Sequence, residues 1–151
     1  MKTLVYIILY FIFLMFLSCN SNSVIENKNK INTDSSVKTL LPNRLEIYAF
    51  HGTRQCETCK NMKTNTKATL DKYFVNELNN GKIIFQIIDV DDVKNEKLAE
   101  KFQATGTALM LNKIVNGKDS IIDWSDFAFD KANDANTYIS ELKTKIETVL
   151  K

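Results

Sequence analysis

The chain has 151 residues, of which 44% are hydrophobic and 25% are charged, and 20 basic residues against 18 acidic ones give a net charge of +2. The lysines are scattered among acids, which excludes a dedicated nucleic-acid-binding protein, because such a protein would carry a basic stripe. Three cysteines are too few for a scaffold held together by disulfides. The length suits one globular domain with its own hydrophobic core.

Residues 1–19 have the pattern of a leader peptide. Lys2 precedes an unbroken apolar run over 4–17, which has the length of a signal-peptide core and is short of the ~20 residues of a membrane-spanning helix. Ser18 and Cys19 end this run and resemble a bacterial lipobox, although the two residues before Ser18 depart from the usual pattern. We therefore predict export and lipidation of Cys19. The alternative is a short uncleaved anchor in which Cys19 has no role.

Residues 20–43 are predicted to be a flexible tether. Asn, Ser, Lys and Thr dominate the segment, and no apolar periodicity persists, so it cannot bury enough surface to fold alone. A coil of about 24 residues would have a reach of roughly 25–30 Å. We expect it to hold a domain over 44–151 at the periplasmic side of a bacterial membrane.

This domain begins with a strand–helix–strand pattern. Leu45–Phe50 is a nearly continuous apolar run, typical of a strand that is buried on both faces. Apolar residues then recur at helical spacing over Cys56–Asn79, and Gly81 follows as a stop signal. Lys82–Val90 has the strongest strand pattern in the chain.

The second half of the domain predicts a helix, a strand hairpin and a final amphipathic helix. The elements are a helix over Asn95–Phe102, strands over Thr107–Val115 and Ser120–Trp124 around the turn Asn116-Gly117, a loop around Phe127 and Phe129, and a helix over Asp134–Lys151. The apolar stripe of the last helix consists of Ile139, Leu142, Ile146, Val149 and Leu150. A right-handed crossover followed by a hairpin gives a βαβ unit and then αββα. The chain is therefore predicted to be an α/β protein with a four-stranded mixed sheet and helices on both faces.

The sequence Cys56-Glu57-Thr58-Cys59 stands where a buried strand ends and a helix begins. A helix N-terminus presents unpaired N–H groups and a partial positive charge, which stabilise a thiolate on the first cysteine. The thiolate is the attacking species in disulfide exchange. Two intervening residues place the second cysteine one turn into the helix, so Cys56 is expected to attack and Cys59 to resolve the mixed disulfide.

Other roles for this pair stay open at the sequence level. A vicinal dithiol could capture a soft metal or metalloid ion through Cys56 and Cys59, because thiolates favour such ions. The pair could also be an inert disulfide that stabilises the loop of an interaction module, although so small a ring constrains the unfolded chain little. A structural zinc site needs four ligands, and the domain offers only His51 besides the two cysteines and carboxylates.

Several neighbours could modulate the pair. His51 is the only histidine and could stabilise the thiolate, shuttle a proton or cap the loop. Arg54 would favour the thiolate, whereas Glu57 would oppose it. The carboxylates of Asp91 and Asp92 follow the second strand and are explained by the turn there.

The order of these elements around the CxxC motif resembles the thioredoxin-like fold family over residues 44–151. More narrowly, the run Phe50-His51-Gly52-Thr53-Arg54 before Cys56, with Lys60 after Cys59, resembles a small group of exported bacterial thioredoxin-like lipoproteins labelled nitrophenyl compound nitroreductase subunit, or ArsF-like. The resemblance implies two-electron exchange with redox partner proteins. One such partner would be a membrane protein that carries reducing power across the bilayer, and no cofactor is expected.

The sequence departs from the thioredoxin pattern at two places. Thioredoxins carry a cis-proline facing the disulfide just after a glycine like Gly106, whereas Thr107 and Ala108 stand here. A non-proline cis bond costs about 2.5–4 kcal/mol, so we expect a trans bond and a different grip on the substrate. Glu57 and Thr58 replace the Gly-Pro of thioredoxins, and this dipeptide tunes the reduction potential within the family. The direction of electron flow is therefore left open.

Overall fold

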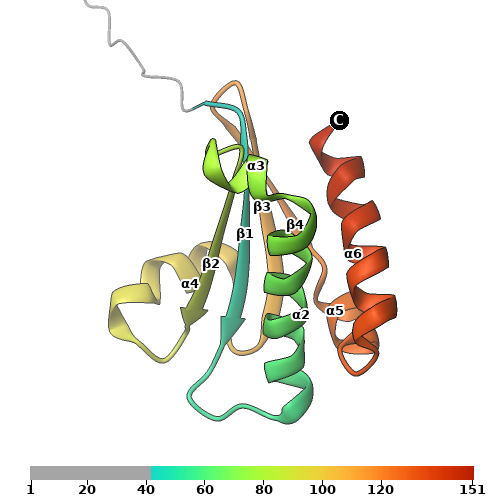
Figure 1. The fold of residues 1–151 in the computed structure, drawn as a ribbon. Helices are drawn as coiled ribbons and strands as arrows, with labels where there is room; N and C mark the ends of the chain where they lie inside the picture. Colours follow the sequence, from blue (N-terminus) through green and yellow to red (C-terminus); the bar gives the residue numbers. More distant parts are fainter. Residues whose placement is uncertain (1–41) are drawn as a thin grey trace, which may run out of the picture. The chain divides into compact units, whose positions relative to one another are not determined.

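The computed structural model describes residues 42–151. The predicted leader, its Cys19 and nearly all of the predicted tether lie outside the described residues. Four strands form one sheet in the order β2-β1-β3-β4 (Figure 1). They are β1 (Arg44–His51), β2 (Ile83–Asp89), β3 (Ala108–Val115) and β4 (Lys118–Asp123).

The directions of the strands follow from their connections. β1 pairs with β2 in parallel, because α2 (Glu57–Tyr73) and α3 (Val75–Asn79) carry the chain back between them. β3 pairs antiparallel with β1 and with β4. Asn116 and Gly117 have φ of 53° and 73° in the tight turn between β3 and β4, as a two-residue hairpin loop with positive φ at both positions requires. The predicted α/β class, four-stranded mixed sheet and hairpin are confirmed, and the arrangement is thioredoxin-like.

One face of the sheet carries the main core. α2 and α6 (Ala135–Leu150) lie side by side over it, with the short helix α5 (Ser125–Lys131) at one end (Figure 1). The core consists of buried apolar residues from strands and helices: Leu45, Ile47, Ala49, Met62, Leu70, Phe74, Ile83, Leu109, Leu111, Trp124, Ala128, Ala132, Tyr138, Leu142 and Ile146. This layer supplies most of the hydrophobic stabilisation of the domain.

The opposite face carries a smaller cluster under α4 (Glu96–Phe102), which follows a 3₁₀ turn over Val93–Asn95. Its members are Tyr48, Phe50, Ile88, Phe102, Ala104, Ala108 and Met110. Alternate residues of β1 point to alternate faces, so Leu45, Ile47 and Ala49 fill the main core, and Tyr48 and Phe50 fill this cluster. Helices on both faces were predicted, and this prediction is confirmed.

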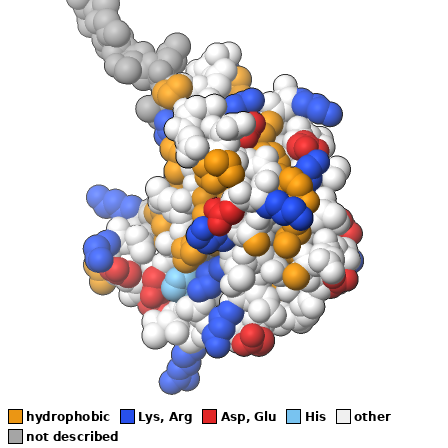
Figure 2. Space-filling view, viewed as in Figure 1, with side chains coloured by type: hydrophobic (Ala, Val, Ile, Leu, Met, Phe, Trp, Pro, Cys, Tyr) orange, Lys and Arg blue, Asp and Glu red, His pale blue; other side chains and the backbone are white. Residues whose placement is uncertain are grey.

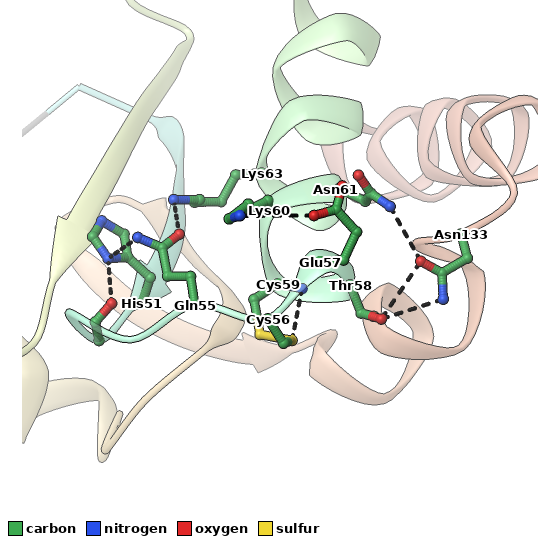
Figure 3. Close-up of a disulfide and its surroundings, with 11 residues drawn as sticks. His51, Gln55, Cys56, Glu57, Thr58, Cys59, Lys60, Asn61, Lys63 and Asn133 are labelled. Carbon is green, nitrogen blue, oxygen red and sulfur yellow. Dashed lines mark hydrogen bonds and ion pairs between the residues drawn. A yellow bond between two sulfur atoms is a disulfide. The ribbon is translucent and has the colours of Figure 1, made fainter.

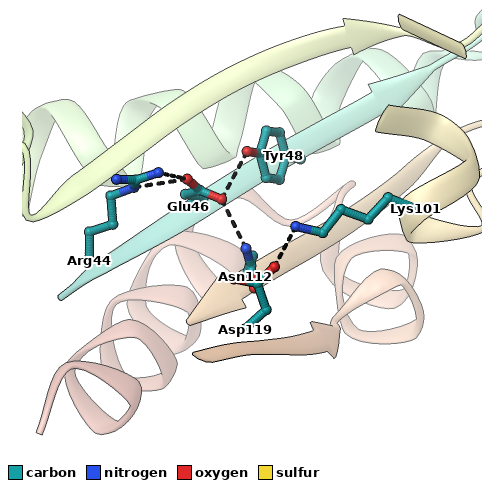
Figure 4. A network of polar contacts seen from close by, with 6 residues as sticks. All are labelled: Arg44, Glu46, Tyr48, Lys101, Asn112 and Asp119. Carbon is teal, nitrogen blue, oxygen red and sulfur yellow. Dashed lines mark hydrogen bonds and ion pairs between the residues drawn. The ribbon is translucent and has the colours of Figure 1, made fainter. Parts of the chain in front are cut away.

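A polar network lies on the same face, toward the start of β1 (Figure 4). Glu46 is only 8% exposed, and its carboxylate accepts hydrogen bonds from Arg44 at 2.6 and 2.8 Å, from Tyr48 at 3.1 Å and from Asn112 at 3.0 Å. Burial opposes ionisation of Glu46, but these hydrogen bonds outweigh it and hold the pKa of the carboxyl below its ordinary value. Burial, together with the Glu46 carboxylate, raises the pKa of Tyr48 to about 12.

The predicted single helix over Cys56–Asn79 is wrong in one respect, because the helix breaks at Phe74. Phe74 adopts φ −128° and ψ 26° and is 4% exposed in the core. α2 has 17 residues, or about 26 Å, which already matches the roughly 27 Å of the eight-residue strand β1. A straight continuation would overrun the sheet, so the chain turns there and Phe74 packs inward. Gly81, with φ 74°, then leads into β2.

Two further predictions need correction on the C-terminal side. Residues Phe127 and Phe129 lie in helix α5 and not in a loop. Seven residues are too few to show a helical period, and burial of Ala128 on the core stabilises this helix. In α6, Ile139 is only partly buried, and Tyr138 is the fully buried residue of that turn. Its hydroxyl lies 2.7 Å from Thr66 Oγ1, and this hydrogen bond satisfies the buried hydroxyl of Tyr138. An apolar stripe does not predict such a residue.

Candidate functional site

The two cysteines lie at the end of the sheet where β1 runs out. β1 ends at His51, a short loop follows, and Cys56 is the N-cap of α2. Cys56 and Cys59 form a disulfide, with their Cα atoms 5.1 Å apart (Figure 3). The predicted strand-to-helix junction therefore holds both sulfurs at the first turn of a 17-residue helix.

The two sulfurs differ in access. Cys56 is exposed, whereas Cys59 is 8% exposed. The amide of Cys59 donates to Cys56 Sγ at 3.1 Å, so one of the unpaired N–H groups of the helix end points at the outer sulfur. An N–H donor and the positive end of the helix both favour a thiolate at Cys56 once the disulfide is reduced.

The loop between β1 and Cys56 is fixed from the end of β2. Asp91 Oδ2 accepts from the amide of Thr53 at 2.7 Å, and this bond holds the pKa of Asp91 below its usual value. A Cβ placed on Gly52 would lie 3.3 Å from the same oxygen, which is a tight approach. Asp91 therefore anchors the loop, in keeping with its predicted place in a strand-end turn.

His51 takes part in the loop and not in a contact with sulfur. Its Nδ1 lies 3.0 Å from the carbonyl of Gly52 and 3.2 Å from Gln55 Nε2 (Figure 3). Lys63 Nζ donates to Gln55 Oε1, which orients the amide so that its N–H faces His51. Among the hydrogen bonds of residues 42–151, none joins His51 to Cys56 or Cys59. The contacts of His51 in this part of the chain are therefore with the loop, and its role toward the thiolate stays a prediction.

A second set of bonds holds the CxxC turn from the other side. Thr58, between the cysteines, lies 3.2 Å from Asn133 Nδ2, and Asn61 Nδ2 donates to Asn133 Oδ1 at 3.2 Å. Asn133 lies in the connection between α5 and α6, 75 residues away from Thr58. We call Thr58, Asn61 and Asn133 the asparagine clasp. Its long sequence separation explains why sequence reasoning missed Asn61 and Asn133. Gln55 and Lys63 were also missed, although their contacts are local, because no sequence motif marks them.

The charges next to the pair partly cancel. Arg54 and Glu57 are both exposed. Glu57 Oε2 lies 3.7 Å from Lys60 Nζ, an exposed ion pair of little energetic weight. Lys60 thus reduces the opposition of Glu57 to a thiolate, a contribution that the sequence analysis did not assign.

Thr107 and Ala108 lie at the same end of the sheet as the cysteines. Ala108 pairs with Phe50 across β1 and β3 and is 7% exposed, and Thr107 precedes it. The described residues contain no cis peptide bond, in agreement with the expected trans bond at this position.

No cluster for a metal ion accompanies the dithiol within residues 42–151. This part of the chain brings together no three side chains of the types His, Cys, Asp and Glu in a ligating arrangement. It also contains no helix with the length and apolar character needed to cross a bilayer. The arrangement of the described residues suits thiol–disulfide redox chemistry, in which the sulfurs are themselves the reacting groups.

Comparison with known proteins gives similarity in structure only. No family model matches the chain, and no curated protein matches it. The structure resembles Fasciola hepatica thioredoxin at 23% identity and a TM-score of 0.42, over 68% of this chain and 81% of that one. It resembles oxidised thioredoxin O2 of Arabidopsis thaliana at 14% identity and a TM-score of 0.43, over 72% and 77%. At these identities and scores, neither activity nor partners transfer to this chain.

Proposed function

We propose that this protein is an exported, membrane-tethered thiol–disulfide oxidoreductase that exchanges two electrons through Cys56 and Cys59. One observation carries the proposal: an exposed sulfur caps a long helix while its partner sulfur lies buried behind it. A partner protein can reach the first sulfur and not the second, so attack and resolution fall to different cysteines.

In the reducing direction, the Cys56 thiolate attacks a sulfur of the partner's disulfide. A mixed disulfide forms, and one partner thiolate leaves. Cys59, deprotonated, then attacks Cys56 Sγ, which forms the intramolecular disulfide and releases the second partner thiolate. Two electrons pass to the partner, and two protons leave the cysteines for the partner thiolates or the solvent. The reverse sequence starts when a partner thiolate attacks the exposed Cys56 of the disulfide.

Export and tethering belong to the same proposal and rest on the sequence pattern. Lipidation of Cys19 after leader cleavage would hold the domain on the periplasmic side of a bacterial membrane through the segment 20–43. In the reducing direction the disulfide would there need a supply of electrons, so a membrane electron-transfer protein is the proposed partner.

Trapping of mixed disulfides tests the assignment of roles. With Cys59→Ala, attack by Cys56 cannot be resolved, so we expect a long-lived disulfide-linked complex on non-reducing gels. Cys56→Ala is the matched control and should trap nothing, because Cys59 is buried. If only Cys56→Ala traps partners, the roles are reversed. If neither variant does, disulfide exchange is not the function.

The dithiol as an ion-binding site is the competing outcome. The protein would be purified under reducing conditions and its bound metals and metalloids measured. We expect no ion in stoichiometric amount, since the described residues offer no third ligand of the ordinary kind. One retained ion per chain that is lost in a Cys56/Cys59 double serine variant would contradict the oxidoreductase proposal.

A further inference from the structure

The end of the domain where β1 begins lies opposite the end that holds the cysteines. The starts of β1 and β2, the hairpin between β3 and β4 and the end of α6 lie at this end (Figure 1). A groove there has a lining that includes Asn43, Lys82, Lys113, Val115, Leu150 and Lys151. Lys118 pairs with Val115 across the hairpin. We call the groove, with Lys82, Lys113 and Lys118, the basic end.

The three lysines of the basic end have no acidic partner among residues 42–151. None of Lys82, Lys113 and Lys118 takes part in the ion pairs of this part of the chain. Lys82 and Lys118 are exposed, and Lys113 is partly buried. Figure 2 shows basic side chains at this end of the molecule. Their charges are therefore available to an anionic group from outside the domain.

The acids near the basic end do not cancel these charges. Three of them already have a basic partner each: Glu46 with Arg44, Asp119 with Lys101, and Glu147 with Lys143. Glu77, which lines a hollow together with Lys82, offsets one positive charge. Lys151 carries its own backbone carboxylate and adds no net charge. Positive groups thus remain in excess at this end.

Charge distinguishes the possible occupants of the basic end. A second copy of the chain would bring like charges together, so two basic ends repel each other. The predicted tether over 20–43 is itself basic, because it contains Lys28, Lys30 and Lys38 against Glu26 and Asp34. An anionic surface complements the basic end and the tether alike, and basic groups next to a membrane are attracted to anionic lipids.

We propose that the basic end docks on the anionic lipid headgroups of the membrane that holds the tether. This inference rests on the tethering in the proposed function and does not depend on the chemistry at Cys56. The tether would join the domain at Asn43, which lines the groove, so the anchored chain brings this end to the lipid. Val115, which is 38% exposed, and the partly buried Leu150 add apolar surface between the lysines, a combination that favours binding at a bilayer surface.

The end of the domain that holds the cysteines has the opposite charge balance. Within residues 42–151, the acids there without an ion pair are Asp89, Asp91, Asp123, Asp126 and Asp134, and the bases without one are Arg54 and Lys63. An anionic surface therefore attracts one end and repels the other. Because β1 has eight residues, or roughly 27 Å, the disulfide would stand at about that height above the lipid. A membrane partner must then present its reactive sulfur on a part outside the bilayer.

Chemical labelling of lysines tests the docking. The full chain is incorporated into vesicles of phosphatidylcholine, alone or mixed with phosphatidylglycerol, and the labelling rate of each lysine is measured by mass spectrometry. We expect Lys82, Lys113 and Lys118 to react at least about fivefold more slowly on the anionic vesicles, the effect of roughly one lysine at such a surface. Lys94 and Lys97 are exposed at the start of α4 and should react equally on both. High salt should remove the protection.

Two double variants with the same change of charge complete the test. Lys113→Glu with Lys118→Glu should make Lys82 react equally on both kinds of vesicle. Lys94→Glu with Lys97→Glu is the matched control and should leave Lys82 protected on the anionic vesicles.

The outcomes separate the docking from the tether. A chain that stays on neutral vesicles, but whose basic end reacts equally on both kinds, overturns the docking and leaves the tether standing. Loss of protection in the control variant alone also overturns the docking. A chain that leaves neutral vesicles has no anchor, which contradicts the tether and the docking together, while the Cys59→Ala trap still reports on the redox chemistry.

Discussion

The two ends of strand β1 use polar side chains for different purposes. At its start, Glu46 is buried and receives bonds from Arg44, Tyr48 and Asn112. At its end, the loop to Cys56 is held by exposed or half-buried groups. The start is closed to water and charged. Removing a partner there would leave a buried charge without solvation or a hydrogen bond, which strongly destabilises the fold. The end is open to water, so its bonds can be remade when a partner approaches.

In this domain, the side chains that stabilise the fold are therefore different from the side chains that orient Cys56. The closed network binds β1 to β3 through Glu46 and Asn112, which also face each other in the sheet register. The open end orients Cys56 with bonds that are individually weak in water. We therefore expect substitutions at the start of β1 to change the free energy of unfolding, and substitutions at its end to change the redox behaviour.

Glu46→Gln should have the largest effect on stability. The loss of a buried, charge-assisted network is expected to lower the free energy of unfolding by about 1–3 kcal/mol at pH 7. The pKa of Glu46 is lowered in the folded state, so its contribution is present above the unfolded value and is lost as pH falls through the folded one. The gap between wild type and variant should therefore close on acidification, as measured by denaturant unfolding at several pH values.

The matched control is Glu57→Gln at the other end of β1. Glu57 is exposed, and its ion pair with Lys60 is weak. This variant should stay within about 0.5 kcal/mol of wild type at every pH. Equal destabilisation by the two substitutions would remove the distinction between a closed end and an open end.

The sequence predicted the fold well because the signals for it are local. Apolar runs, helical spacing and the Asn116-Gly117 turn each lie within a few residues, and so does the CxxC motif. The misses have another origin. Glu46 meets Asn112 over 66 residues, and Thr58 meets Asn133 over 75. Such contacts depend on register and on helix packing, which a local pattern does not contain.

Tyr138→Phe tests a buried polar group that is neutral, in contrast to the charged Glu46. Thr66 Oγ1 donates to the carbonyl of Met62, so Tyr138 is the donor toward Thr66. Loss of this bond should cost about 1 kcal/mol at pH 7. Burial raises the pKa of Tyr138 to about 12. Wild type is therefore fully stabilised below the unfolded pKa of about 10 and loses stability as pH rises from there toward 12.

The phenylalanine variant lacks this loss, so its stability should fall less steeply above pH ~10. We expect the two unfolding curves to approach each other or cross between about pH 10 and 12. The measurement is denaturant unfolding across that range. A constant difference between wild type and variant would mean that Tyr138 titrates normally, and hence that its hydroxyl reaches water.

Asn133→Ala tests the open end and should have the smallest effect on stability. It breaks the asparagine clasp by removing the exposed hydrogen bonds of Asn133 to Thr58 and Asn61. The free energy of unfolding should fall by less than about 1 kcal/mol. Because Thr58 lies between the cysteines, the equilibrium of the Cys56–Cys59 pair with glutathione should shift, by less than about tenfold, or ~30 mV.

Asn136→Ala is the control, since Asn136 is exposed on α6 and outside the clasp. If both variants leave the equilibrium unchanged, Asn133 holds the turn without tuning it. If Asn133→Ala costs as much stability as Glu46→Gln, the open end is as rigid as the closed one.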